Sequence, residues 1–185
     1  MLFNSIEFGF FFISVFGLYW FVTGKNLRLQ NLLLLVVSYV FYSFWDWRFL
    51  FLLIFSTLLD YYSGLKIESS QKPNARRAWL WISLGINLGF LGVFKYYNFF
   101  IESFVAGFER LGITIEPWTL TVILPVGISF YTFHGVSYII DIYKRRIQAE
   151  RNFIEYSVFV CYFPLLVAGP IERATHLLPQ IKKQR

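Results

Sequence analysis

A stripe of polar and small residues interrupts one apolar segment, LPVGISFYTFHGVSYIIDIYKRR, at residues 124–146. At 3.6 residues per turn, this stripe falls on one face of a helix. It places a serine, a histidine and an aspartate together, which are the side chains used in nucleophilic acyl chemistry. The members of the stripe are Gly127, Phe130, His134, Ser137, Asp141 and Arg145.

Helix geometry excludes a catalytic triad within this segment. Ser137 lies one turn from His134, but Asp141 is roughly 10 Å from that histidine along the axis, at 1.5 Å per residue. Asp141 therefore cannot orient the imidazole. Because a histidine and an aspartate are costly against lipid, we expect the stripe to wall a cavity or to hydrogen-bond to neighbouring helices. The opposite face carries Ser129, Val136 and Ile139.

A second unusual stretch, FPLLVAGPIERA, occupies residues 163–174. Proline removes a backbone donor and bends a helix, and glycine allows another backbone to approach closely. Gly169 and Pro170 are followed by the charged pair Glu172 and Arg173. This order predicts a sharp turn beside a polar pocket, the alternative being an ordinary helix end.

Three isolated residues carry less information. Asp60, beside two tyrosines, is expected to cap its helix or to pair with the basic loop that follows. Lys95 is expected to extend toward the membrane interface. The single cysteine, Cys161, excludes an intrachain disulfide, and the sequence indicates no metal site.

The elements that position these residues are membrane helices. The 185 residues are 57% hydrophobic and 15% charged, and the mean hydropathy of +0.54 is far above that of a soluble domain. A helix needs roughly 17–25 apolar residues to cross a bilayer. We therefore predict an all-α integral membrane protein, residues 1–185 forming one membrane domain, with spans at residues 8–23, 31–45, 48–65, 79–100 and 118–142 and a weaker one at 153–170.

Two of these boundaries have a predicted geometry. The second and third spans meet at Asp46, Trp47 and Arg48, which predicts a tight helical hairpin. The sixth is interrupted by prolines and a glycine, so we expect a broken or re-entrant segment. The chain then ends in a basic tail, residues 172–185, with His176 on the surface.

Charge sets the expected orientation. The net charge of +6 comes from short basic runs between apolar segments, which indicates membrane topology and not a nucleic-acid partner. The basic loops at residues 66–78 and 143–152 are expected on the cytoplasmic side, and the acidic segment at 102–117 is expected outside.

Five stretches together resemble the membrane-bound O-acyltransferase (MBOAT) family, in the branch that acetylates alginate and other exported polysaccharides. They are the two stretches described above and MLFNSIEFGFFF, SYVFYSFWDWRFLFLLIFSTLLDYYSG and KYYNFF. The resemblance implies that the predicted five to six transmembrane or re-entrant helices are the N-terminal part of a helix ring around a thinned centre. The residues that match the family's pattern, and that would shape the site, are Pro125, Gly127, Ser129, Phe130, Thr132, Tyr138, Asp141, Ala168, Gly169 and Pro170. With the polar stripe, the expected cavity wall is Gly127, Phe130, His134, Ser137, Asp141, Gly169 and Pro170.

The resemblance implies transfer of an acetyl group, from acetyl-CoA or another acyl carrier, to a polysaccharide hydroxyl, with no bound cofactor. The partners implied are membrane lipids, a missing C-terminal half or downstream polypeptide, and the polysaccharide acceptor or a periplasmic acetyltransferase. The location implied is a bacterial inner (cytoplasmic) membrane. The family's catalytic histidine lies downstream of the AGP motif, beyond Arg185, so the chain alone is expected to be inactive. His134, where many relatives carry glutamine, is the fallback catalytic residue. The alternative function is a non-catalytic membrane subunit or transporter half in glycan export or modification.

Overall fold

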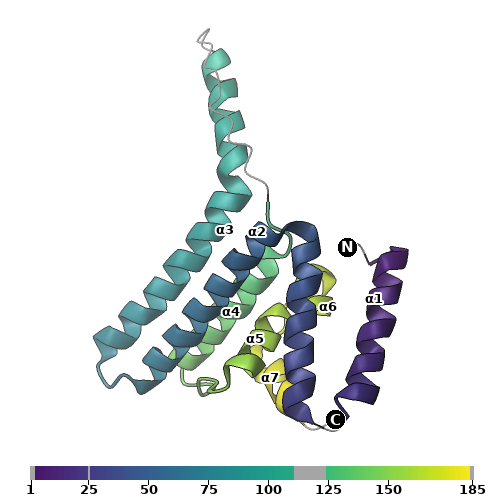
Figure 1. The fold of residues 1–185 in the computed structure, drawn as a ribbon. Coiled ribbons are helices and arrows are strands. Elements are labelled where there is room, and N and C mark those ends of the chain that lie inside the picture. The colour runs from purple at the N-terminus through teal and green to yellow at the C-terminus, as the bar shows by residue number, and fades with distance from the viewer. Residues whose placement is uncertain (1–2, 25, 111–123, 184–185) are drawn as a thin grey trace.

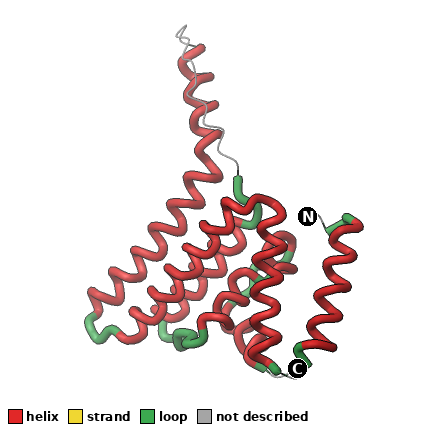
Figure 2. The backbone as a smooth tube through the Cα atoms, in the orientation of Figure 1, coloured by secondary structure: helices red, strands yellow, loops and turns green. Residues whose placement is uncertain are grey.

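A computed structural model describes residues 3–24, 26–110 and 124–183 of the chain. These residues form seven α-helices and one short π-helix. Figures 1 and 2 show helices joined by short loops, with no strand in the described part of the chain. The predicted all-α class is confirmed.

The first helix, α1, spans Ile6–Gly17 and continues as the π-helix η1, Leu18–Val22. It begins at Ser5, whose Oγ accepts a hydrogen bond from the Phe8 N–H at 3.2 Å, as an N-cap serine should. The predicted span at residues 8–23 therefore coincides with one helical element.

The second helix, α2, runs over Leu27–Ser69 but breaks at Asp46, where φ is −160° and ψ is 112°. The Asp46 carboxylate accepts hydrogen bonds from the Arg48 N–H at 3.0 Å and from the Arg48 guanidinium at 2.6 Å, which stabilises the turn. The chain reverses direction there, so α2 forms two antiparallel halves (Figure 1). The predicted hairpin is confirmed.

The third helix, α3, spans Pro73–Glu109 and is longer than the predicted span at residues 79–100. Residues 102–109, predicted to belong to an external connection, continue this helix, because the segment contains no proline to end it. The remainder of that predicted connection, including Glu116, lies outside the described residues. In Figure 1 the last turns of α3 project beyond the other helices.

The central helix is α4, Ile128–Tyr143, which begins later than the predicted span at residues 118–142. Residues 118–123 lie outside the described part of the chain. Helix α4 packs against α2, α3, α5, α6 and α7, so it is enclosed on most sides. His134 and Asp141 of the polar stripe are buried, as expected, and Ile139 on the opposite face is fully buried as well.

The sixth predicted segment is broken, as expected. It forms α5, Phe153–Cys161, and α6, Phe163–Ala168, separated by Tyr162 with ψ of 110°. Pro164 lies in the first turn of α6, where a missing N–H costs little, and the break precedes it.

The predicted basic tail is not a tail in the structure. Most of it forms α7, Ala174–Lys182, an amphipathic helix that buries Ala174, Leu178 and Ile181. The Asn31 side-chain amide donates a hydrogen bond to the Ile181 carbonyl at 3.1 Å, which attaches α7 to α2. His176 is exposed, as predicted.

The two basic loops predicted to be cytoplasmic lie at the same end of the bundle. Glu68 accepts hydrogen bonds from the Ala149 N–H at 3.1 Å and from Arg151 at 2.9 Å. Arg76 donates to the Tyr143 carbonyl at 2.8 Å. These contacts join residues 66–78 to residues 143–152, as the predicted alternation of spans requires.

Two described helices, Leu27–Ser69 and Pro73–Tyr97, are long and apolar enough to cross a membrane. Large apolar side chains also stay exposed, for example Phe21 at 87% and Phe10 at 71%. Such a surface suits lipid as the surrounding solvent, or further protein, better than it suits water.

Helix α4 is positioned by a buried polar cluster at Asp60 on α2. The Asp60 Oδ1 atom accepts hydrogen bonds from Ser83 Oγ at 2.6 Å and from Asn87 Nδ2 at 2.7 Å, both on α3. Ser56, one turn before Asp60, donates to Asn87 Oδ1. Asp60 has no ion pair with any described residue, so the prediction that it pairs with the basic loop is wrong. Asp60 was expected near the end of its helix, and in the structure it lies where α2, α3 and α4 meet.

Gly135 of α4 completes this junction, because a Cβ atom there would overlap the Asp60 carboxylate. The absent side chain is therefore what lets α4 lie against the α2–α3 pair. Asp60, Ser83 and Asn87 are all at most 1% exposed.

The overlap predicts that Gly135→Ala separates α4 from Asp60 and lowers the free energy of unfolding by about 1–3 kcal/mol. The matched control is Gly89→Ala on α3, where a Cβ meets nothing within 4 Å. Alanine at that helical position should be neutral or stabilising by less than about 1 kcal/mol. Thermal unfolding of both variants in detergent, followed by circular dichroism, measures the difference, and equal melting temperatures would contradict the junction.

A second prediction concerns the donors to the buried carboxylate. Asn87→Leu leaves Asp60 with Ser83 as its hydrogen-bonding partner and should lower stability by about 2–3 kcal/mol. The double variant Asp60→Leu/Asn87→Leu should recover part of this loss, since the desolvated carboxylate is gone. Unfolding midpoints of the two single variants and the double variant test this coupling, and simple additivity would rule it out.

Candidate functional site

The two unusual stretches of the sequence meet in space, at the start of α4 and the end of α6. Gly127 precedes α4 with φ of 75°, a left-handed conformation that favours glycine. A Cβ atom there would lie 2.6 Å from the Leu166 carbonyl oxygen of α6. Glycine is therefore required twice at this position, for its backbone angle and for the close approach of α6.

His134 makes the second contact between the two stretches. Its ring is 1% exposed and packs 5.3 Å from the Phe159 ring of α5. The Nε2 atom accepts a hydrogen bond from the Glu172 N–H at 3.2 Å. Since Nε2 is the acceptor, the proton of the neutral ring is assigned to Nδ1, which faces the Val160 carbonyl without a hydrogen bond of ordinary geometry.

The C-terminal half of the stripe lines a pocket of about 400 Å³. Ser137 and Asp141 line it from α4, and Ile171 and Arg173 line it from the segment after α6. The remaining lining residues are Phe133, Val136, Ile140, Lys144 and Arg146. The pocket thus combines an apolar wall with charged groups at one end, and both stretches contribute to it.

Ser137, Asp141 and His134 of the stripe each have a different partner. Ser137 Oγ donates to the His134 carbonyl of its own helix at 2.9 Å. Asp141 Oδ1 accepts from Arg146 at 3.3 Å, while the His134 ring contacts Glu172. These side chains therefore form no nucleophile–base pair among themselves, and in this arrangement they shape a wall.

The other residues assigned to the cavity wall lie at its border. Phe130 is half-buried on α4, and Pro170 is exposed. Gly169 ends α6 in an extended conformation, and a Cβ there would overlap Leu165. The turn between α6 and Glu172 is therefore compact, which brings the Glu172 N–H to His134.

Glu150 is a buried acidic residue that the sequence analysis did not single out. Its Oε1 atom accepts from the Arg151 and Asn152 N–H groups, both at 2.9 Å, and Oε2 accepts from Lys182 at 2.8 Å. The Glu150 N–H donates to the Tyr138 hydroxyl at 2.9 Å. The hydrogen bond from Lys182 raises the pKa of that ammonium group. The available signal in the sequence was an acidic residue two positions before Asn152, the residue that caps α5.

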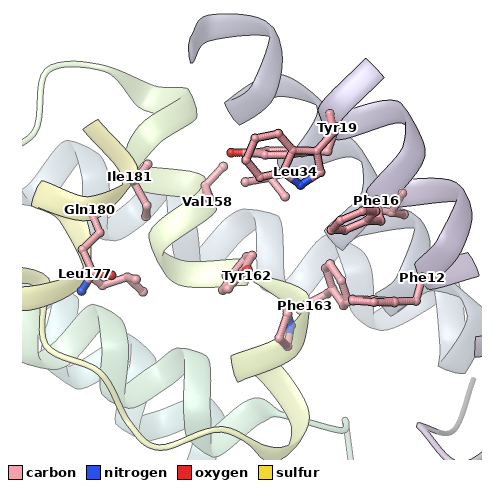
Figure 3. A pocket seen from close by; sticks show the side chains of 13 residues that line it. Phe12, Phe16, Tyr19, Leu34, Val158, Tyr162, Phe163, Leu177, Gln180 and Ile181 are labelled. Atoms are coloured by element: carbon pink, nitrogen blue, oxygen red, sulfur yellow. The ribbon is translucent and has the colours of Figure 1, made fainter. Parts of the chain in front are cut away.

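A second cavity, of about 420 Å³, lies between α1 and the α5–α7 side of the bundle (Figure 3). Phe12 and Phe16 line it from α1, Val158 from α5, and Leu177 and Ile181 from α7. Its lining suits an apolar group and offers no pair of acid and base. Within the described ranges, no three His, Cys, Asp or Glu side chains gather closely enough to hold a metal ion.

Comparison with known proteins places the chain beside bacterial O-acetylases. No family model and no solved structure matches it. It is 44% identical over its full length to a probable alginate O-acetylase AlgI of Pseudomonas putida, of which it covers 38%. It is 42% identical over 97% of its length to the corresponding protein of Pseudomonas aeruginosa, of which it covers 34%.

A relative with a different named substrate is the peptidoglycan O-acetyltransferase of Helicobacter pylori. The identity is 35% over 98% of this chain, which covers 39% of that protein. The chain thus spans little more than a third of the length of the curated relatives it matches. The chain is thus homologous over its full length to part of these alginate and peptidoglycan O-acetylases, in agreement with its resemblance to the membrane-bound O-acyltransferase family.

Proposed function

We propose that the chain is the N-terminal part of a membrane O-acyltransferase that transfers an acetyl group to hydroxyls of an exported polysaccharide. The relatives, named for alginate and peptidoglycan acetylation, support this assignment over the whole chain. We further propose that the two sequence stretches form one wall of the acyl-transfer site. The observation that supports this wall is the hydrogen bond between His134 and Glu172. It joins the two stretches that resemble the family into one wall.

The proposed role of these residues is positional. His134 Nε2, the nitrogen that would accept a proton, already accepts the Glu172 N–H, and the ring is buried. His176, the other histidine, is exposed and pairs with Glu172 Oε2 at 2.8 Å. We therefore place the catalytic base outside residues 1–185.

In the proposed reaction, a sugar hydroxyl attacks the acetyl carbonyl of the donor while a general base accepts the hydroxyl proton. The acyl–carrier bond breaks, and the carrier leaves as a free thiol when it is a thioester such as acetyl-CoA. The proposed setting is a bacterial inner membrane. The proposed partners are lipids, the remaining polypeptide, the polysaccharide and a periplasmic acetyltransferase.

Two substitutions separate a positioning histidine from a catalytic one. In the complete acetylase, His134→Gln should keep polysaccharide acetylation within about threefold of the wild type, because a glutamine oxygen can accept the Glu172 N–H. His134→Leu should reduce acetylation by about tenfold or more, because that buried N–H loses its acceptor. The acetyl content of the exported polysaccharide, normalised to the amount of protein in the membrane, measures both.

The amount of folded protein is the control, and size-exclusion chromatography in detergent reports it. Equal loss of acetylation in His134→Gln and His134→Leu, with both variants folded, would assign His134 to the proton transfer itself.

The placement of the base has a direct test. The purified 185-residue chain, supplied with acetyl-CoA and an alginate or peptidoglycan acceptor, should release no thiol above the rate without protein. A colorimetric thiol assay measures this, with the complete acetylase as the positive control. Acceptor-dependent thiol release by the chain alone would place the catalytic base within residues 1–185.

A further inference from the structure

A polar pocket of about 490 Å³ lies at the loop end of the bundle, away from the contact between His134 and Glu172. It is built from the end of α2, the start of α3 and the end of α4, the same ends that carry the two basic loops. We call it the arginine pocket. Its lining residues are Glu68, Ser70, Gln71, Arg76, Ile142, Arg145, Arg146, Ile147 and Gln148.

The charges in this pocket do not balance within it. Three arginines line it against one carboxylate, Glu68. Both oxygens of that carboxylate are already used, one by the Ala149 N–H at 3.1 Å and the other by Arg151 at 2.9 Å. Arg151 is not part of the lining, so it neutralises Glu68 from outside. The pocket therefore presents an excess of positive charge.

Two of the arginines are held in place by the helices. Arg76 donates to the Tyr143 carbonyl at 2.8 Å, and its guanidinium lies 5.7 Å from the centre of the Tyr143 ring. Arg146 pairs with Asp141 at 3.3 Å. A guanidinium carries five N–H donors in a fixed plane, so these single contacts orient each group and leave donors for a ligand.

Arg145 adopts an unusual backbone conformation. Its φ is 58°, and it is the one non-glycine residue with a positive φ among the residues the structure describes. The Arg145 N–H bonds the Ile142 carbonyl at 2.9 Å and the Arg146 N–H bonds the Asp141 carbonyl at 2.8 Å, a helix end that normally uses glycine. Its exposed side chain has no hydrogen bond or ion pair to the described residues. An arginine thus occupies a backbone position where glycine is usual.

We propose that the arginine pocket binds a phosphate group. Planar guanidinium groups recognise phosphate with two parallel hydrogen bonds, and two fixed arginines beside one free arginine form such a site. Basic pockets between membrane helices at the cytoplasmic surface face anionic lipid headgroups. The phosphate has two possible sources, the headgroup of an anionic lipid or a soluble phosphate-bearing thiol or thioester such as coenzyme A or acetyl-CoA. Binding is measured without turnover, so this inference stands or falls separately from acetyl transfer.

The competing explanation is that the arginines only close the helix ends. Cations near a helix C-terminus stabilise that helix. Arg76 of α3 contacts Tyr143, the last residue of α4. Under that explanation Arg145→Gly relaxes the backbone and changes nothing else. Under our proposal the same substitution relaxes the backbone and also removes a ligand contact.

The experiment uses the purified chain in a maltoside detergent, which contains no phosphate. Phosphatidylglycerol binding is measured by native mass spectrometry, and coenzyme A and inorganic phosphate binding by equilibrium dialysis. Arg145→Gly and Arg76→Gln should each weaken binding of the active probe by about tenfold, the loss expected for one charge-assisted hydrogen bond. Arg77→Gln is the matched control, because Arg77 is the next residue of α3, is exposed and does not line the pocket.

The results assign the source of the phosphate. Arginine-dependent binding of phosphatidylglycerol alone identifies a lipid site, binding of coenzyme A alone identifies a soluble ligand, and binding of both identifies a general phosphate site. The melting temperature of Arg145→Gly should equal or exceed that of the wild type, which shows that lost binding is not lost folding. The proposal is overturned if Arg77→Gln weakens binding as much as the pocket variants do. It is also overturned if the wild-type chain binds every probe no more strongly than Arg145→Gly does.

Discussion

The buried carboxylate of Asp60 is the constraint on which the arrangement of the bundle depends. A polar group this deep must have hydrogen-bonding partners, and Asp60 takes them from Ser83 and Asn87 on the neighbouring helix. Apolar contacts distinguish helix positions poorly when the surroundings are lipid, because lipid is as apolar as the side chains. Directional hydrogen bonds therefore set the register of α2 against α3, and Gly135 sets the depth of α4.

Once α4 is fixed at Gly135, its two ends carry different contacts. Toward its start, Gly127 admits the Leu166 carbonyl, and His134 receives the Glu172 N–H. Toward its end, the Tyr138 hydroxyl accepts the Glu150 N–H, and the arginine pocket begins. The packing of α4 against Asp60 thus positions both the candidate wall and the arginine pocket. A shift of α4 would disturb these sites together.

Features set by local covalent and charge chemistry were predictable from the sequence. Asp46 and Arg48 mark the hairpin, and the prolines and glycine mark the broken segment, because these residues act on their own backbone. Features set by distant contacts were not. The partners of Asp60 lie over twenty positions away on α3, and the burial of Ile139 follows from α4 being enclosed. Likewise, Leu178 and Ile181 become a buried face only when α7 packs against α5 and α4.

The polar stripe shows that residue types on one helical face do not by themselves establish a catalytic site. Ser, His and Asp share a helical face, yet each is satisfied by a different neighbour, and the contact that uses the histidine's basic nitrogen is a backbone N–H. In an apolar medium, an unsatisfied N–H after a proline turn is costly, so an acceptor is needed wherever such a turn packs against a helix. His134 supplies that acceptor at Glu172. The burial of the His134 imidazole is therefore explained by the hydrogen bond that it accepts from the backbone, without proton transfer.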